Sequence, residues 1–233
     1  MSNFKFKKFD ICQTNSAMKV GTDGVLLGAW ACSEKPKHIL DIGAGTGLIT
    51  LMLAQRYPLA LLDGVEPDQL AIIDTKHNFE HSDFADRLTL HHERIQNFNP
   101  KIRYDLIVSN PPYFERSLKP EKDGRRNARH DSLLSFEELM IATSRLLTDS
   151  GNSDFIIPSD REQELVKLAY TYGLHLNRKT AVRGKEESPI KRVLVSFSSN
   201  KSTPKVDELV IEKSRHTYTE SYVNLTKDFY LKM

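Results

Sequence analysis

The tetrapeptide Asn110-Pro111-Pro112-Tyr113 is the part of this sequence that most directly indicates a chemistry. It follows an apolar run, 104–109, that is typical of a buried strand. A proline has no backbone N–H and biases the residue before it towards an extended conformation, so the strand must end here. The Asn110 side-chain oxygen and the Pro111 carbonyl can then accept both hydrogens of an amide-like NH2 group on a planar substrate, which Tyr113 can stack against. An ordinary strand-ending turn is the alternative.

A second candidate site lies upstream, around a glycine-rich segment. A short apolar run, 38–42, precedes the glycines of 43–47, and apolar residues at helical spacing follow in 48–54. This order predicts a strand, a tight turn and a helix. Glycines let the backbone approach a ligand, and a helix N-terminus offers free N–H groups. The GxGxG spacing leaves Leu48 where the GxGxxG turn of a dinucleotide-binding fold needs a small residue.

An acidic residue completes this second site. The run 60–66 is typical of a strand and ends in Glu66, about twenty residues beyond the glycines, where a carboxylate can accept both hydroxyls of a ribose. We therefore predict that a nucleotide-containing cofactor binds above these strand ends. A plain strand-to-helix connection is the alternative for the glycine turn. The predicted floor of the cofactor site consists of Asp41, Gly43, Gly45, Gly47 and Glu66.

Strands and helices alternate along most of the chain, which predicts an α/β fold with a mostly parallel sheet. The pattern changes after residue 173, where two strand-like runs, 174–183 and 190–198, are separated by only six residues. Such a connection is too short for a parallel crossover, so these runs predict an antiparallel hairpin. The run 206–212 predicts an additional edge strand, and 218–231 predicts a C-terminal helix.

Capping-box patterns mark the starts of two predicted helices. Ser135 with Glu138 has the spacing of a capping box, and Ser159 with Glu162 repeats it. A further helix is predicted to reach Trp30 from a glycine-flanked loop; for Asp23, a plain N-cap is the alternative to a part in a binding site.

Composition and length predict one well-packed domain that spans residues 1–233. Hydrophobic residues make up 39% of the chain and charged residues 27%, which argues against long disordered segments. No apolar run has membrane-spanning length, and the N-terminus lacks the apolar core of a secretory signal, so a cytoplasmic protein is expected. The two cysteines, and histidines without ligand spacing, predict no metal.

Basic side chains gather just after the tetrapeptide. The whole chain has 33 Lys and Arg against 31 Asp and Glu, a net charge of +2, so its overall field would not recruit nucleic acid. Between Glu115 and His130, however, six basic residues stand against three acidic ones. We predict that Arg125, Arg126 and Arg129 contact the phosphates of a nucleic-acid substrate. A solvated charged loop is the alternative.

The motifs in this order resemble those of class I S-adenosylmethionine-dependent methyltransferases. The NPPY tetrapeptide resembles the signature of members that modify planar amino nitrogens. With the segment 18–28 and the overall length, the chain resembles bacterial tRNA adenine-N6 methyltransferases that act beside the anticodon of a valine tRNA. The resemblance implies a Rossmann-like, mostly parallel sheet of seven strands with a C-terminal antiparallel hairpin. It also implies S-adenosyl-L-methionine as cofactor, tRNA as partner, no membrane and no metal; a monomer is expected.

The resemblance also implies roles for individual residues. Thr22 and Asp23 would bind the methionine end of the cofactor, and Glu93 would read its adenine. The family places an acid where this chain has Arg94, so Glu93 takes that role in its stead. The tetrapeptide Asn110, Pro111, Pro112 and Tyr113 would form the catalytic site, with Asn110 also beside the cofactor, while Tyr113 and Phe114 would hold the extruded adenine.

Three other functions remain open at this point. A guanine-N2 methyltransferase of ribosomal RNA and a protein glutamine methyltransferase would use the same two acceptors. The glutamine enzymes usually carry an additional N-terminal substrate domain, for which this chain has no room. From a different class, the chain could be a non-catalytic nucleotide-binding or RNA-binding module, against which the intact tetrapeptide argues.

Overall fold

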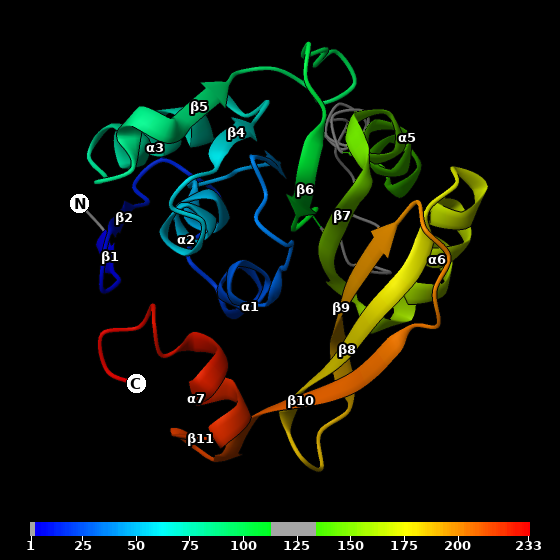
Figure 1. Ribbon diagram of the computed structural model, residues 1–233. Helices are drawn as coiled ribbons and strands as arrows, with labels where there is room; N and C mark the ends of the chain where they lie inside the picture. Colours follow the sequence, from blue (N-terminus) through cyan, green and yellow to red (C-terminus); the bar gives the residue numbers. More distant parts are fainter. Residues whose placement is uncertain (1–2, 113–133) are drawn as a thin grey trace, which may run out of the picture.

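The computed structural model describes residues 3–112 and 134–233. Its centre is a nine-stranded sheet with the order β11-β10-β8-β9-β7-β6-β3-β4-β5, and a separate two-stranded hairpin lies near the N-terminus (Figure 1). The hairpin consists of β1 (Asn3–Lys5) and β2 (Asp10–Cys12). The strands of the large sheet are β3 (His38–Ile42), β4 (Leu61–Val65), β5 (Leu88–His91), β6 (Tyr104–Ser109), β7 (Leu147–Pro158), β8 (His175–Lys185), β9 (Ile190–Ser198), β10 (Lys205–Ser214) and β11 (Thr217–Tyr218).

The predicted mostly parallel sheet with a C-terminal antiparallel hairpin is confirmed. From β5 to β7 all neighbours are parallel, and β9 lies antiparallel between β7 and β8. The seven strands that the resemblance implies are thus present, and β3, β4, β6, β8 and β9 lie at runs predicted above. The sheet nevertheless has nine strands, because β10 joins β8 in parallel and β11 pairs antiparallel with β10. The predicted edge strand is therefore present as β10, but β11 takes the edge beside its C-terminal end.

Helices cover both faces of the large sheet. The helices are α1 (Thr22–Trp30), α2 (Leu48–Arg56), α3 (Gln69–Glu80), α5 (Phe136–Leu146), α6 (Glu162–Thr171) and α7 (Glu220–Thr226), with short 3-10 turns at Ala85–Arg87 and Ser159–Arg161. Side chains of α5 and α6 share one buried cluster with the sheet, whereas α1, α2 and α7 contribute to a second cluster. Figure 1 shows these two sets of helices on opposite sides of the central strands.

Two helix predictions need correction. Ser135 caps α5 in a complete capping box with Glu138, as predicted. Ser159 does not cap α6, because its hydroxyl donates to the Ile190 carbonyl at 2.8 Å and a 3-10 turn precedes the helix. The C-terminal helix predicted for 218–231 is only the seven-residue α7, since Tyr218 pairs in a strand.

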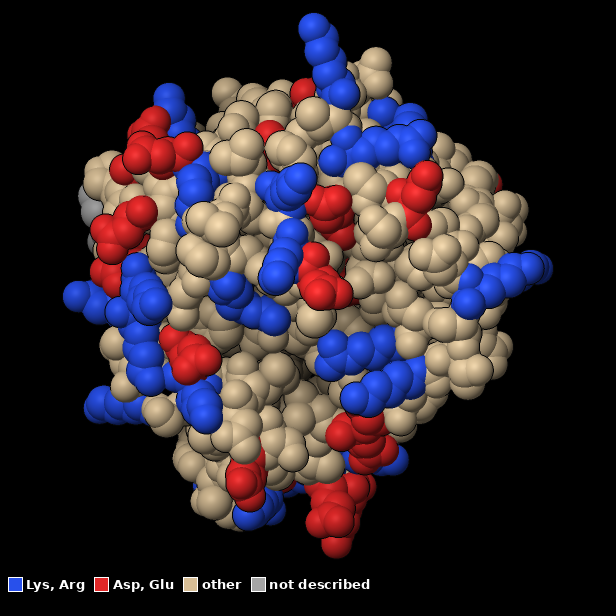
Figure 2. Space-filling view, in the orientation of Figure 1, with Lys and Arg blue, Asp and Glu red and all other residues tan. Residues whose placement is uncertain are grey.

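The two ends of the chain pack together. Phe6 forms an isolated antiparallel bridge with Tyr230, and the Lys7 N–H donates to the Phe229 carbonyl at 2.8 Å. Phe6 and Phe229 are both buried in a cluster that includes α1 and α2 side chains. Figure 2 shows that basic and acidic side chains are interspersed over the face of the molecule seen there, which agrees with the net charge of +2. Attraction of a polyanion must therefore come from local groups rather than from one large field.

Candidate active site

The residues predicted to bind the cofactor and the substrate come from the carboxyl ends of neighbouring strands. β3 lies between β4 and β6, with Ile42 opposite Val65 and Asp41 opposite Val108. The glycine turn that follows β3 is therefore flanked by Glu66 after β4 and by Asn110 after β6. In open α/β sheets, ligands bind at this edge, outside the carboxyl ends of the strands.

The glycine turn holds its backbone in a left-handed conformation that other residues rarely adopt. The φ angles of Gly43, Gly45 and Gly47 are +75°, +59° and +78°. A Cβ atom at Gly43 would meet no atom of the described residues within 4 Å, whereas one at Gly47 would lie 2.6 Å from Cε1 of Phe79. The start of the turn thus leaves space for a ligand against the backbone, and its end packs against α3.

Glu66 is fixed against this turn by two backbone donors. Its Oε2 accepts from the Gly45 N–H and its Oε1 from the Asp68 N–H, each at 2.8 Å. The side chain is buried, and burial raises the pKa of the carboxyl, while the same two N–H groups act to lower it. A carboxylate oxygen has more than one lone pair, so both oxygens can still accept from a diol.

Asp41 lies beneath the turn with one oxygen satisfied. It is 1% exposed, and its Oδ2 accepts from the Thr50 hydroxyl at 2.6 Å. Its Oδ1 is buried and has no hydrogen-bond partner among the residues that the structure describes. Burial raises the pKa of Asp41 to about 7, and the neighbouring Glu66 charge contributes in the same direction. An ionised oxygen without a donor is costly to bury, so this position is suited to a donor from a ligand.

The chain leaves the sheet at the start of the tetrapeptide, as the two prolines require. β6 ends at Ser109, whose buried hydroxyl donates to the Ile42 carbonyl at 2.7 Å and ties this strand end to β3. Asn110 is half-buried, Pro111 is buried and Pro112 is exposed. The register places Asn110 beside Gly43. The remaining substrate candidates, Tyr113, Phe114, Arg125, Arg126 and Arg129, lie outside the described residues.

Thr22 and Asp23 lie at the start of α1. The N-cap is Gly21, without a side-chain cap, so the alternative of Asp23 as a plain N-cap does not hold. Asp23 lies in the first turn, and its Oδ2 accepts from Nε of Arg192 at 2.7 Å. Arg192 is opposite Pro158, the last residue of β7. Asp23 is thereby held at the same edge of the sheet as the glycine turn.

Glu93 follows the last strand on the other side of the site. β5 ends at His91, which is opposite Val65, so Glu93 lies two residues beyond a position level with the end of β4. Its side chain is half-buried. Glu93 therefore follows β5, which is the neighbour of β4, the strand that leads into Glu66. Its proposed contact with the cofactor adenine stays a prediction.

Polar side chains of α3 support the turn, and sequence reasoning missed them. The Thr75 hydroxyl donates to the Gly45 and Ala71 carbonyls, and Asn78 Nδ2 donates to the Thr46 carbonyl at 2.8 Å. Asp74 accepts from the N–H groups of residues 15 and 16 at 2.8 and 2.7 Å. The signal was the spacing of Ala71, Asp74, Thr75 and Asn78, which puts small and polar residues on one buried helical face.

Arg192 was also missed, since nothing in the local pattern connects it with a residue 169 positions away. The part of the chain that the structure describes contains no group of three or more His, Cys, Asp or Glu side chains that could hold a metal ion. None of its helices combines the length and the apolar character needed to cross a membrane.

Comparison with known proteins decides the family. Residues 17–124 match the family described as "Methyltransferase small domain". Over its full length the chain is 46% identical to the tRNA1(Val) (adenine(37)-N6)-methyltransferase of Christiangramia forsetii, with 100% of both chains covered. The chain belongs to this methyltransferase family. Family members from Phocaeicola vulgatus and Trichodesmium erythraeum are 44% and 43% identical, each over 99% of this chain and 98% of the relative.

Solved structures confirm the methyltransferase fold. A predicted O-methyltransferase from Agrobacterium tumefaciens superposes with a TM-score of 0.68 at 19% identity, covering 89% of this chain and 96% of that chain. A glycopeptide N-methyltransferase, solved in complex with S-adenosyl-L-methionine, gives a TM-score of 0.56 at 13% identity over 80% of this chain and 91% of that chain. At these identities the methyltransferase likeness concerns the fold alone.

Proposed function

We propose that the protein transfers the methyl group of S-adenosyl-L-methionine to the N6 amine of an adenine in tRNA, the base next to the anticodon of a valine tRNA. The observation that carries this proposal is the 46% identity, over both full lengths, to a relative named for that reaction. The arrangement of the glycine turn, Glu66 and Asn110 on three neighbouring strands supports it.

The residues present fit the proposed cofactor. Gly43 leaves open space against the backbone, and Asp41 has a buried oxygen without a donor among the described residues. Glu66 would accept the ribose hydroxyls, and Glu93 would accept from the adenine. S-Adenosyl-L-methionine would supply a methyl group that its sulfonium already activates. The protein therefore needs to provide position rather than activation.

The N-terminus of α1 would hold the methionine end. Thr22 offers a hydroxyl, and Asp23 offers a carboxylate that can accept from an ammonium group. Arg192 keeps this carboxylate in place through its 2.7 Å contact, and it adds a positive charge that suits the carboxylate of an amino acid. Two opposite charges at one place match the zwitterionic end of the ligand.

The tetrapeptide would orient the target amine. The lone pair of an adenine amino nitrogen is delocalised into the ring, which makes the nitrogen a poor nucleophile. If the Asn110 side-chain oxygen and the Pro111 carbonyl accept its two hydrogens, they favour a pyramidal nitrogen and stabilise the positive charge that develops on it. Pro111 is buried, so its carbonyl is held by the packing around it. No strong base is needed for this step.

Base capture is proposed from the sequence of the segment that follows. Tyr113 and Phe114 would stack against an adenine extruded from a loop, and Arg125, Arg126 and Arg129 would contact phosphates. Stacking is worth about 1 to 3 kcal/mol per base, and an unpaired loop base is the easiest to extract. A single domain in the cytoplasm, where tRNA is modified, completes the proposal.

The test is radiolabelled methyl transfer into total RNA from a strain that lacks the gene, followed by mass-spectrometric mapping of the labelled nucleoside. We expect N6-methyladenosine at one adenine of valine tRNA, and far less label in the same time with Asn110→Ala. Label in N2-methylguanosine or in protein glutamine would replace the proposed substrate by one of the two other methyltransferase activities. Cofactor binding without any transfer would favour a non-catalytic module.

A further inference from the structure

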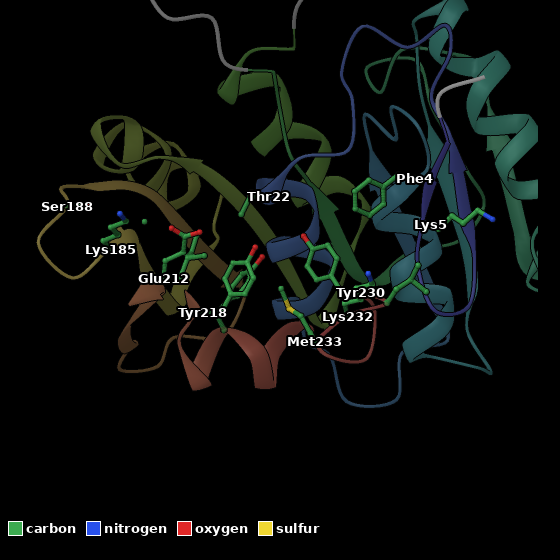
Figure 3. A pocket seen from close by; sticks show the side chains of 14 residues that line it. Phe4, Lys5, Thr22, Lys185, Ser188, Glu212, Tyr218, Tyr230, Lys232 and Met233 are labelled. Carbon is green, nitrogen blue, oxygen red and sulfur yellow. The ribbon is translucent and has the colours of Figure 1, made fainter. Parts of the chain in front are cut away.

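A cavity of about 910 Å³ lies at the edge of the sheet beside the proposed active site, and of the residues that line it only Thr22 has a role in the proposed function. Its walls come from the N-terminal hairpin, the ends of β8 and β10, and the C-terminal segment from β11 onward. Figure 3 shows the rings of Tyr218 and Tyr230 at this space, with Thr22 above them in the view, Lys185 and Glu212 on one side and Phe4 on the other. Residues from the N-terminal hairpin and from 230–233 thus line the same space.

The position of this cavity relates it to the proposed active site. Thr22 lines the cavity, while Asp23 next to it faces Arg192 at the start of β9. The strand order runs from β6, which leads into Asn110, through β7 and β9 to β8 and β10. Neighbouring strands are about 4.8 Å apart, so the cavity begins roughly 14 to 19 Å from the end of β6. With stacked nucleotides about 3.4 Å apart, this distance corresponds to a few nucleotides of one RNA strand.

The lining of the cavity combines aromatic rings with positive charge. Four aromatic side chains contribute to it, namely Phe4, Tyr218, Tyr222 and Tyr230. Lys5, Lys185 and Lys232 also line it, and Glu212 is the one acidic side chain that the described part of the chain contributes. Aromatic faces next to lysines are what single-stranded nucleic acid requires, since bases stack on the rings and lysines contact the phosphates.

The aromatic platform is fixed in place. Tyr222 is 3% exposed, and its ring centroid lies 5.2 Å from that of Tyr218. Tyr230 stacks against Phe6 at 5.8 Å, and Phe6 is itself buried. Tyr218, by contrast, is 37% exposed and offers its ring to the cavity. A stacking surface that is already ordered loses little conformational entropy when a base binds.

We infer that this cavity binds an unpaired nucleotide of the RNA substrate, at a position a few residues from the methylated base. The base stacks on Tyr218, and Lys185 and Lys232 contact the neighbouring phosphates. This inference rests on the proposed function, because it assumes an RNA substrate. It adds a second point of attachment, which would select RNAs in which both nucleotides are unpaired and correctly spaced.

The decisive variants are Tyr218→Ala, which removes the stacking surface, and Tyr218→Phe, which keeps it. Steady-state kinetics are measured with full-length transcripts of valine tRNA. We expect Tyr218→Ala to raise the KM for tRNA about 5- to 140-fold, the factor that corresponds to stacking of one base, with little change in kcat or in cofactor affinity. Tyr218→Phe should retain a KM close to that of the unaltered protein. Tyr170→Ala, on the exposed surface of α6, is the matched control.

The lysines give an independent measurement. Log affinity for tRNA falls linearly with log salt concentration, with a slope of about −0.7 per phosphate contact for single strands. Lys185→Ala and Lys232→Ala should each make this slope less steep by about 0.7, whereas Lys167→Ala on α6 should leave it unchanged.

The outcomes separate this inference from the function on which it rests. If the unaltered protein methylates valine tRNA but Tyr218→Ala has the same KM as Tyr170→Ala, and the two lysine variants keep the original slope, the cavity does not bind RNA while the proposed function stands. If the unaltered protein transfers no methyl group to tRNA, the proposed function itself fails. Thermal unfolding of each variant shows whether a raised KM comes from a loss of folded protein.

Discussion

Replacing Gly47 by alanine tests how the end of the glycine turn is fixed. Gly47 has φ +78°, and the added Cβ would lie 2.6 Å from Cε1 of Phe79 and 3.1 Å from Cγ2 of Thr75. Phe79 is 4% exposed and belongs to a buried cluster, so its ring cannot simply rotate into solvent. The substitution therefore combines a backbone cost with a steric cost at one position.

The two costs can be estimated separately. A left-handed conformation costs a residue with a Cβ roughly 1 to 2 kcal/mol. Overpacking a close-packed interior costs a further 1 to 3 kcal/mol or so. We expect Gly47→Ala to lower the free energy of unfolding by about 2 to 5 kcal/mol, a large part of the roughly 5 to 15 kcal/mol that stabilises a typical domain. The variant should also bind the cofactor less well, because the steric conflict displaces the turn.

Urea denaturation of the unaltered protein, Gly47→Ala, Phe79→Leu and the double variant separates the two costs. Phe79→Leu removes the atom nearest to the new Cβ, so Gly47→Ala should cost about 1 to 3 kcal/mol less in the Phe79→Leu background than in the unaltered protein. Gly173→Ala is the matched control. Gly173 has φ +77°, and its added Cβ would meet no described atom within 4 Å, so it carries the backbone cost alone.

Two results would refute this reasoning. If Gly47→Ala costs the same with Phe79 and with Leu at that position, the ring does not restrict the turn. If Gly47→Ala costs no more than Gly173→Ala, the steric contribution is absent and only the backbone conformation matters.

Three further predictions concern the site. Asn110→Ala should bind the cofactor with unchanged affinity but lose about 100- to 1,000-fold in kcat, as when one stabilising contact to developing charge is removed. Calorimetry measures the affinity and single-turnover assays measure the rate; a wild-type rate would show that Asn110 has no part in the mechanism. Burial raises the pKa of Asp41 from 3.8 to about 7, so between these pH values the folded protein holds a proton that the unfolded chain releases. The free energy of unfolding should therefore fall as the pH rises from 4 to 7. In urea titrations, Asp41→Asn should reduce this fall by at most about 4 kcal/mol, and identical pH profiles of the two proteins would contradict the prediction. Arg192→Ala leaves the half-buried Asp23 carboxylate without this ion pair and should cost about 1 to 3 kcal/mol of stability, with part recovered by Arg192→Lys; full stability of the alanine variant would show that the contact contributes nothing.

Much of the fold and of the candidate site could be predicted from the sequence, because these features depend on local patterns. The strands β3 and β6 begin and end at the predicted residues, because apolar runs bounded by glycines or prolines have few alternatives. The same holds for the capping box at Ser135 and for the short link that forces β8 and β9 into a hairpin. The order of glycine turn, acid and tetrapeptide along the chain then predicted the methyltransferase family.

Contacts between distant segments were decided only by the tertiary structure. Ser159 and Glu162 have the spacing of a cap, yet the Ser159 hydroxyl is closer to the Ile190 carbonyl of another strand. Asp is a residue type that often caps helices, yet Asp23 pairs with Arg192, a charged partner 169 residues away. The cavity between the chain ends depends on the packing of Phe6 against Tyr230. A local pattern records which hydrogen bonds a residue can form, whereas the fold determines which partner is within reach.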